Sequence, residues 1–226
     1  MSMDWRKAWK KTWYFIWESD SVMSWIVNII LAFVLIKFLV YPGLGLVMDT
    51  SHPIVAVVSG SMEHKAVHPC KISSSSGCIK KDSEYYQICG KRFDKKQENG
   101  FDFFWENCGD WYEKNTDISK TDFSKFRFKN GFNTGDIMVL KGVEASDIVV
   151  GDTIVYISRG ASYPIIHRVI DIEEKNRGYM FTTKGDHNSD GDASIDDSKI
   201  IGKAVSRVPL LGWIKIGAVK LWRVFV

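Results

Sequence analysis

Hydrophobic and polar positions divide the chain into an N-terminal stretch with helical periodicity and a long remainder in which apolar residues alternate with polar ones. Near the start, tryptophan recurs every fourth residue, so a helix would carry Trp5, Trp9, Trp13 and Trp17 along one face. Arginine and lysine lie between these rings, which is typical of a helix on a membrane surface. An ordinary surface helix is the alternative. We favour the membrane because a row of indole rings is difficult to leave in water.

An apolar run follows, from Ser24 to Tyr41. A helix over it would rise about 27 Å, close to the thickness of a hydrocarbon core. We expect it to end near Pro42-Gly43, because a longer helix would place Lys37 in mid-bilayer at a cost of about 3 kcal/mol. A cleavable signal peptide is the alternative, but the basic leader is long and no small-residue cleavage site follows. The run therefore predicts a single anchor with a cytoplasmic N-terminus and an external remainder.

From Pro53 onward, short segments of alternating residues are bounded by Gly-Asp or polar turns, which is typical of β-strands. The predicted strands cover 54–58, 137–140, 153–157, 165–172, 179–183 and 200–205. Between Cys70 and about Asn133 the alternation disappears, which indicates an insertion into a β domain. After Pro209, an apolar segment with three basic residues predicts either an interfacial helix or a helix packed on the sheet.

These patterns divide the chain into four parts. They are an interfacial helix plus anchor over 1–48, a β-rich domain over 49–69 and 134–208, a cysteine-containing insertion over 70–133, and a C-terminal interfacial helix over 209–226.

Composition adds two constraints. The net charge of +3 is small and scattered, so nucleic acid is not an expected partner. The cysteines all fall in the predicted insertion, and an even, clustered set favours disulfides in an oxidising compartment. A zinc site is the rival interpretation, but no pair has the short spacing that zinc ligands use. The disulfide candidates are Cys70, Cys78, Cys89 and Cys108.

A candidate nucleophile lies where the first strand ends, in Ser59-Gly60-Ser61-Met62-Glu63. A serine beside glycine can be held on a tight turn, with backbone N–H groups nearby for an oxyanion, although this is also common turn chemistry. His167 lies on a predicted strand, where a lone histidine is more often structural. The hairpin predicted around Lys175 would place His167 opposite about Lys184, beside the loop 185–192. A carboxylate of that loop could orient the imidazole, and the residues leave three open: Asp186, Asp190 and Asp192.

Two metal-site interpretations compete for these residues. The loop from Asp186 to Gly191, with Asp197 at the twelfth position, matches a calcium-loop pattern, but its flanks are typical of strands rather than of the helices of an EF-hand. His64, His68 and Cys70 lack a fourth ligand at a suitable spacing. We therefore predict neither a metal nor another cofactor.

Together, the motifs resemble the type I signal peptidases of the branch found in archaea and the endoplasmic reticulum. The matching segments occur in the family's order and cover about residues 24–63 and 134–210: Ser59-Gly60-Ser61-Met62-Glu63, Gly135-Asp136-Ile137-Met138-Val139, Gly151-Asp152-Thr153-Ile154-Val155-Tyr156, Ile166-His167-Arg168-Val169, and Thr183-Lys184-Gly185-Asp186 through Asp192. The resemblance implies a β-rich catalytic domain. Together with the anchor and the insertion predicted above, the expected fold is mainly β: a signal-peptidase-like antiparallel β catalytic domain with an N-terminal transmembrane helix and an inserted disulfide-containing subdomain. The resemblance also implies a serine endopeptidase in which Ser61 is the nucleophile, His167 the base and Asp192 the acid. Ser59 would line the oxyanion hole, with Asp186 and Met62 in supporting roles.

The resemblance further implies removal of signal peptides from exported preproteins through an acyl-enzyme. The expected partners are signal peptides, membrane lipid and the protein-export channel. The expected location is the cell membrane, in a single pass with an extracytoplasmic catalytic domain; the alternative is the endoplasmic reticulum membrane with a lumenal one. Two departures from the family are His64, where proline is usual, and the long insertion. They keep open a non-proteolytic or narrow-specificity relative that acts as an extracytoplasmic binding module through the insertion.

Overall fold

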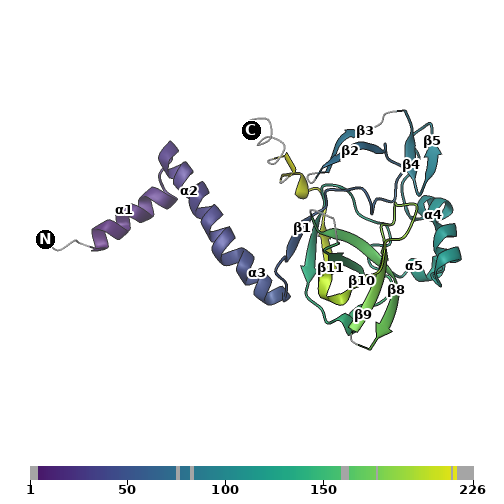
Figure 1. The fold of residues 1–226 in the computed structure, drawn as a ribbon. Helices are drawn as coiled ribbons and strands as arrows, with labels where there is room; N and C mark the ends of the chain where they lie inside the picture. The colour runs from purple at the N-terminus through teal and green to yellow at the C-terminus, as the bar shows by residue number, and fades with distance from the viewer. Residues whose placement is uncertain are drawn as a thin grey trace. The chain divides into compact units, whose positions relative to one another are not determined.

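The computed structural model describes residues 5–74, 77–81, 84–158, 163–176, 178–214 and 216–217, with the side chains of 70–83 outside this description. The chain forms two compact units, Met1–Val47 and Met48–Val226, which are described separately below. Figure 1 shows the helices of the first unit and the sheet and insertion of the second.

The first helix of the N-terminal unit, α1 (Trp5–Trp17), carries its tryptophans as the spacing predicts. The rings of Trp9 and Trp13 lie 6.2 Å apart between centroids, and those of Trp13 and Trp17 lie 5.8 Å apart. All of these rings are exposed. The end of α1 is bonded to the next helix, because Asn28 Nδ2 donates to the Ile16 carbonyl oxygen at 2.8 Å.

One apolar helix follows, over Val22–Met48, and its length and composition would allow it to cross a membrane. It consists of α2 (Val22–Leu35), the π-helical turn η1 (Ile36–Val40) and α3 (Tyr41–Met48). The expectation that it ends near Pro42-Gly43 is wrong. A proline inside an α-helix lacks an N–H and collides with the preceding turn, whereas a wider π turn relieves the collision. Here the Tyr41 N–H, just before Pro42, donates five residues back to the Ile36 carbonyl oxygen.

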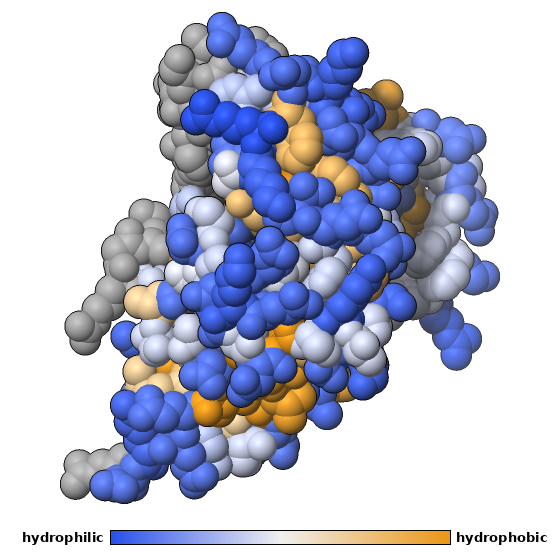
Figure 2. All heavy atoms as spheres, turned by 90° about the vertical axis from the view of Figure 1, so that its right-hand side faces the viewer, coloured by the Kyte–Doolittle hydropathy of each residue, from blue (hydrophilic) through white to orange (hydrophobic). Residues whose placement is uncertain are grey.

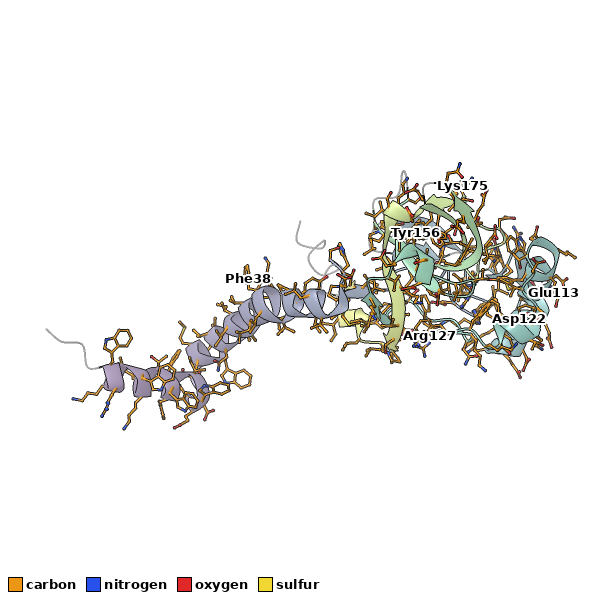
Figure 3. All side chains as sticks on the ribbon, turned by 90° about the horizontal axis from the view of Figure 1, so that it is seen from below. Phe38, Glu113, Asp122, Arg127, Tyr156 and Lys175 are labelled. Atoms are coloured by element: carbon orange, nitrogen blue, oxygen red, sulfur yellow. A yellow bond between two sulfur atoms is a disulfide. The ribbon has the colours of Figure 1, made fainter. Side chains whose placement is uncertain are left out.

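Lys37 consequently lies within the helix rather than near its end. Its ammonium nitrogen is 5.8 Å from the centroid of the Phe33 ring and 5.5 Å from that of Phe38, the latter labelled in Figure 3. The negative faces of aromatic rings attract a cation. These two contacts therefore supply part of the stabilisation that the ammonium would otherwise obtain from water.

The second unit is built on a seven-stranded antiparallel sheet of order β1-β6-β11-β7-β8-β9-β10. All six predicted strands are confirmed to within a few residues. The strands are β1 (Ile54–Ala56), β6 (Ile137–Lys141), β7 (Thr153–Tyr156), β8 (Ile165–Lys175), β9 (Gly178–Lys184), β10 (Ile195–Asp196) and β11 (Ile200–Val208), with short 3₁₀ turns η2 (Ala145–Asp147) and η3 (Asp197–Lys199).

The β8–β9 hairpin has a register one residue from the expected one. Arg168, rather than His167, pairs with Lys184, and the register shifts between Val169 and Asp171. A β-bulge of this kind adds one residue to one strand and displaces all later pairs. His167 pairs on its other side with Ile154 of β7.

The described residues of the insertion form two hairpins and two helices: β2 (Cys70–Ser74), β3 (Gly77–Lys81), β4 (Tyr86–Ile88), β5 (Lys91–Phe93), α4 (Phe101–Asn115) and α5 (Lys120–Phe123). Its core is aromatic, with Phe104, Tyr112 and Phe123 fully buried. The same core cluster includes Ile170 of β8, so the insertion packs directly on the sheet. The face on the α4 side is largely hydrophilic, with scattered apolar areas (Figure 2).

Cys89 and Cys108 form a disulfide that joins the β4–β5 turn to α4. The other two candidates, Cys70 and Cys78, have side chains outside the described residues.

The start of the C-terminal segment is bonded to the turn that precedes β6. Gly212 N–H donates to the Gly135 carbonyl oxygen at 2.8 Å, and Leu210 N–H donates to Asp136 Oδ1 at 3.2 Å. Most of the interfacial helix expected over 209–226 lies outside the described residues.

Replacing both Cys89 and Cys108 by serine should lower the free energy of unfolding by about 3 kcal/mol, the value expected when a loop of this length is released in the unfolded chain. The two cysteines are 19 residues apart. Denaturant unfolding of the full chain in detergent would measure the change, with Asp110→Asn on the exposed face of α4 as the control. An unchanged midpoint in the double variant would contradict the prediction.

Candidate active site

The turn that follows β1 holds two serines at the surface. Glu63 N–H donates to the Gly60 carbonyl oxygen at 3.0 Å, which closes the turn. The Met62 side chain is buried, and Glu63 Oε1 accepts a hydrogen bond from Thr134 N–H at 2.9 Å, so the turn is anchored in the protein interior. Ser59 is exposed and Ser61 half-buried, with their hydroxyl oxygens 3.2 Å apart.

His167 lies on β8 with only 6% of its surface exposed. Its Nδ1 is 2.6 Å from Asp192 Oδ2, and the same carboxylate oxygen accepts from Thr183 Oγ1 at 2.8 Å and from the Tyr156 hydroxyl at 3.3 Å. Burial acts to raise the pKa of Asp192, but the bond from His167 and these hydroxyls hold it below its ordinary value. Asp192 therefore stays ionised and accepts a hydrogen bond from the Nδ1–H group of His167, which leaves Nε2 as an acceptor.

Tyr156 extends this network from the neighbouring strand β7 and is labelled in Figure 3. Its hydroxyl also lies 2.9 Å from Thr183 Oγ1. Burial raises the pKa of Tyr156 to about 12. The phenol thus remains a hydrogen-bond donor to Asp192 across the physiological pH range.

Gly185 is the point at which His167 and Ser61 meet. A Cβ atom on Gly185 would lie 2.8 Å from His167 Nε2 and 2.9 Å from the Ser61 carbonyl oxygen, so a larger residue would displace one of them. The Ser61 carbonyl accepts from His187 N–H at 2.8 Å. Within the described part of the chain, the Ser61 hydroxyl is bonded to Ser59 rather than to His167. Serine-to-base bonds commonly shorten only when a substrate is bound.

Asp186 occupies a separate, fully buried position. Its Oδ1 accepts from Arg168 Nε at 2.9 Å and from the Tyr112 hydroxyl at 3.0 Å. Its Oδ2 accepts from Arg168 Nη2 at 2.7 Å and bonds with His64 Nε2 at 2.8 Å. Burial would raise the pKa of Asp186, but the charge of Arg168 and the bond from His64 outweigh it and hold the pKa well below its ordinary range. Asp186 is therefore a buried carboxylate bonded on both oxygens.

His64, the residue where the family usually has proline, belongs to this cluster. Its ring stacks on Phe104 of α4, with centroids 3.7 Å apart and planes inclined by 6°. Burial lowers the pKa of His64 despite the opposing effect of Asp186, so the imidazole remains neutral. Among the described residues its Nδ1 has no hydrogen-bond partner. His64 thus connects the serine turn to the insertion.

The residues of the competing metal-site interpretations have other partners. Asp186 is bonded to Arg168, Asp190 Oδ2 accepts from Ser189 Oγ at 2.8 Å, and Asp197 Oδ2 accepts from Tyr179 N–H at 3.1 Å. The loop is flanked by strands β9 and β10 rather than by helices. His68 is bonded to the Tyr85 carbonyl oxygen at 2.9 Å. In the described ranges, no group of three or more histidine, cysteine, aspartate or glutamate residues is placed to hold a metal ion.

Sequence reasoning did not single out Tyr156, Arg168 or Thr183 as partners of the candidate site. The one available signal was the position of Arg168, a charged residue that lies between the apolar pairs Ile165-Ile166 and Val169-Ile170. A charge at such a position requires a buried partner. The sequence could not identify that partner.

A serine hydroxyl, an imidazole whose Nε2 lies near the serine backbone across Gly185, and a carboxylate bonded to the imidazole are the groups that serine-based acyl transfer uses. Comparison with known proteins narrows this class. No protein-family model matches the chain. Its homologues are signal peptidase catalytic subunits, as the motif resemblance predicts. The signal peptidase complex catalytic subunit SEC11C of Homo sapiens is 31% identical over 94 residues, which cover 38% of this chain and 49% of that protein.

Two further relatives have the same designation. The catalytic subunit SEC11 of Candida tropicalis is 33% identical over 94 residues, 38% of this chain and 56% of that protein. That of Dictyostelium discoideum is 34% identical over 94 residues, 38% of this chain and 52% of that protein. The chain spans about half the length of the curated relatives it matches.

The buried pair of Asp186 and Arg168 generates a stability prediction. Asp186→Asn should lower the free energy of unfolding at neutral pH by about 3–5 kcal/mol, because it leaves the buried Arg168 charge uncompensated. The folded pKa of Asp186 lies below its ordinary value. The contribution is therefore fully present above the ordinary carboxyl pKa of about 4, and is lost as the pH falls below it.

Urea unfolding of wild type and Asp186→Asn between acidic and neutral pH would measure this difference. Asp171→Asn, which changes an exposed aspartate on β8, is the matched control. A difference between wild type and Asp186→Asn that grows as the pH falls would contradict the assigned direction.

Proposed function

We propose that this chain is a membrane-bound serine endopeptidase that removes signal peptides from exported preproteins. The observation that carries the proposal is His167, whose Nδ1 is bonded to Asp192 while its Nε2 faces the turn of Ser61 across Gly185. The homology to signal peptidase catalytic subunits supports the same reaction.

In the proposed mechanism, the Ser61 hydroxyl attacks the carbonyl carbon of the scissile bond while His167 Nε2 takes its proton. Asp192 stabilises the imidazolium that forms, and the imidazolium then protonates the leaving amine. Water hydrolyses the resulting ester with His167 again as the base, which regenerates the Ser61 hydroxyl.

The negative oxygen that develops on the attacked carbonyl needs hydrogen-bond donors. The Ser59 hydroxyl is a suitable donor because it lies 3.2 Å from the Ser61 hydroxyl oxygen. The Ser61 N–H is a second one, since it donates to no acceptor among the described residues. Subtracting one such donor commonly costs a factor of 10² to 10³ in kcat.

The N-terminal unit supports a membrane location for the substrate as well as for the enzyme. A signal peptide contains an apolar segment that resides in the bilayer, so a membrane-tethered Ser61 would encounter its cleavage site at high effective concentration. The helix over Val22–Met48 is the proposed anchor, and α1 the helix on the membrane surface. We propose that membrane lipid and the export channel are further partners.

The Cys89–Cys108 disulfide supports an oxidising environment for the second unit. The proposed location is therefore the cell membrane with this unit outside. The endoplasmic reticulum membrane with a lumenal unit is the alternative, because both compartments are oxidising. The relatives are named as subunits of a complex, which supports additional protein partners.

Ser61→Ala should abolish cleavage of a preprotein by the purified chain in detergent, lowering kcat by about 10⁴-fold or more because it removes the hydroxyl that forms the ester. Ser189→Ala, which removes an exposed hydroxyl from the loop 185–192, should retain wild-type activity. Equal cleavage by wild type and Ser61→Ala would contradict the proposal.

Asp192→Asn should lower kcat by about 10⁴-fold, because an amide favours the wrong imidazole tautomer and cannot stabilise the imidazolium. Asp190→Asn is the matched control, since its carboxylate is exposed and bonded only to Ser189 among the described residues. Steady-state cleavage of a synthetic signal-peptide substrate would measure both. Full activity in Asp192→Asn would show that another carboxylate orients His167.

A further inference from the structure

The loop Gly185–Asp192 holds the proposed active site together. It carries Asp192 at its end, its Gly185 separates His167 from Ser61, and its His187 N–H donates to the Ser61 carbonyl oxygen at 2.8 Å. A displacement of the loop would therefore move the serine turn and the imidazole relative to each other. The contacts that hold the loop in place therefore also maintain the geometry of the proposed catalytic residues.

The ammonium group of Lys184 lies inside this loop and is fully buried. It donates to three carbonyl oxygens of the same turn, those of Asn188 at 2.6 Å, Gly185 at 3.1 Å and Asp186 at 3.4 Å. Three convergent carbonyls around one cation resemble the coordination of a bound ion. The turn is thus folded around the Lys184 charge.

The charge of Lys184 is not matched by a direct ion pair within the described residues. The charged or titratable groups that act on it are Asp186, Asp190 and Asp192 of the loop, and it acts in turn on His64 and His187. Arg168 on β8 is its cross-strand neighbour, and Tyr112 faces it from α4. Burial lowers the pKa of Lys184 to about 8, although the three carboxylates oppose the shift. Because burying an ammonium group without a direct ion pair costs free energy, its presence here indicates a structural or functional role.

The insertion covers this cation. Lys184 Nζ lies 5.0 Å from the Trp111 ring centroid and 5.2 Å from that of Tyr112, both on α4. Trp111 also contacts the loop, because a Cβ atom on Gly191, next to Asp192, would lie 3.2 Å from it. Cys89 N–H donates to the His187 carbonyl oxygen at 2.9 Å, and the disulfide ties this contact to α4. The insertion therefore contacts the loop near its start, its middle and its end.

We infer that Lys184 is a positioning residue of the proposed peptidase, whose buried ammonium group holds the Gly185–Asn188 turn, and that Trp111 and Tyr112 of the insertion complete this scaffold. The inference rests on the proposed function. It gives the insertion a role in the geometry of the site rather than in binding a separate partner.

Loss of the Lys184 charge should then lower kcat at high pH. As the pH rises through about 8, the ammonium becomes a neutral amine with fewer donors, and the turn loosens. We expect an alkaline fall in kcat near that pH, with KM little changed. A shift of the reacting groups by about 1 Å can cost up to about 10²-fold in rate.

The test is the pH dependence of kcat and KM for cleavage of a synthetic signal-peptide substrate by the full chain in detergent. Lys184→Met should lower kcat by about 10–100-fold at neutral pH and remove the alkaline fall. Lys184→Arg should keep the charge and move the fall to higher pH. Wild-type kcat and an unchanged alkaline fall in both variants would overturn the inference.

If these buried substitutions prevent folding, a substitution at an exposed residue tests the same inference. Asp190→Asn removes a carboxylate that stabilises the Lys184 charge, so the alkaline fall should move to lower pH while kcat on the acidic side of the fall stays the same. Asp171→Asn, exposed on β8, should leave the fall in place. Identical profiles for Asp190→Asn and Asp171→Asn would count against Lys184 as the titrating group.

Variants on α4 test the role of the insertion. Trp111→Leu should lower kcat severalfold by removing the ring over Lys184, and Tyr112→Phe should lower it by removing the bond to Asp186. Glu113→Gln changes the next residue of the helix, which is exposed and labelled in Figure 3, and should behave as wild type. Unchanged kcat in both aromatic variants would overturn the role of the insertion. The Ser61→Ala variant distinguishes failure of this inference from failure of the proposed function. Cleavage by Ser61→Ala equal to that by wild type would refute the proposed function itself.

Discussion

The buried ion pair between Arg168 and Asp186 is the interaction on which the rest of the second unit depends. All five N–H donors of the guanidinium have acceptors, two on Asp186 and three on the carbonyl oxygens of Arg127, Gly151 and Phe128. The guanidinium also lies 4.6 Å from the Phe123 ring centroid. Burying a charge is costly, and the pairing of every guanidinium donor offsets that cost here. The strand, the loop and the insertion must therefore adopt one arrangement together.

This constraint connects the two features that depart most from the family pattern. His64 and the insertion meet at the ion pair, because His64 bonds to Asp186 while stacking on Phe104 of α4. Tyr112 of the same helix bonds to the other oxygen of Asp186. A proline at position 64 could supply neither the bond nor the stack, so the histidine and the inserted helix are best understood as one structural unit. The insertion therefore helps to hold the serine turn in place through His64.

Local patterns predicted those elements whose determinants are local. Strand alternation identified the sheet, the apolar run identified the long helix, and the order of the motifs placed Ser61, His167 and the acidic loop on one domain. The sequence patterns did not predict two local details. The helix continues through Pro42 because a π turn accommodates the proline ring, and the β8–β9 register shifts because of a bulge. Both are details of backbone hydrogen bonding that the pattern of hydrophobic and polar residues does not encode.

By itself, the sequence determined six strands of the sheet, the apolar helix apart from its end, the candidate nucleophile and base, and a short set of candidate acids. The residues themselves left the acid open and the family resemblance implied Asp192, but only the tertiary structure shows its contact with His167 and the reason for it. Asp192 reaches the imidazole, while Asp186, six residues earlier, turns inward to Arg168. The physical reason is that a carboxylate pairs with the cation or donor that the fold brings within about 3 Å, and that partner is distant along the chain. The contact of Trp111 and Tyr112 with Lys184 is of the same kind, since α4 and the loop approach only in the folded protein.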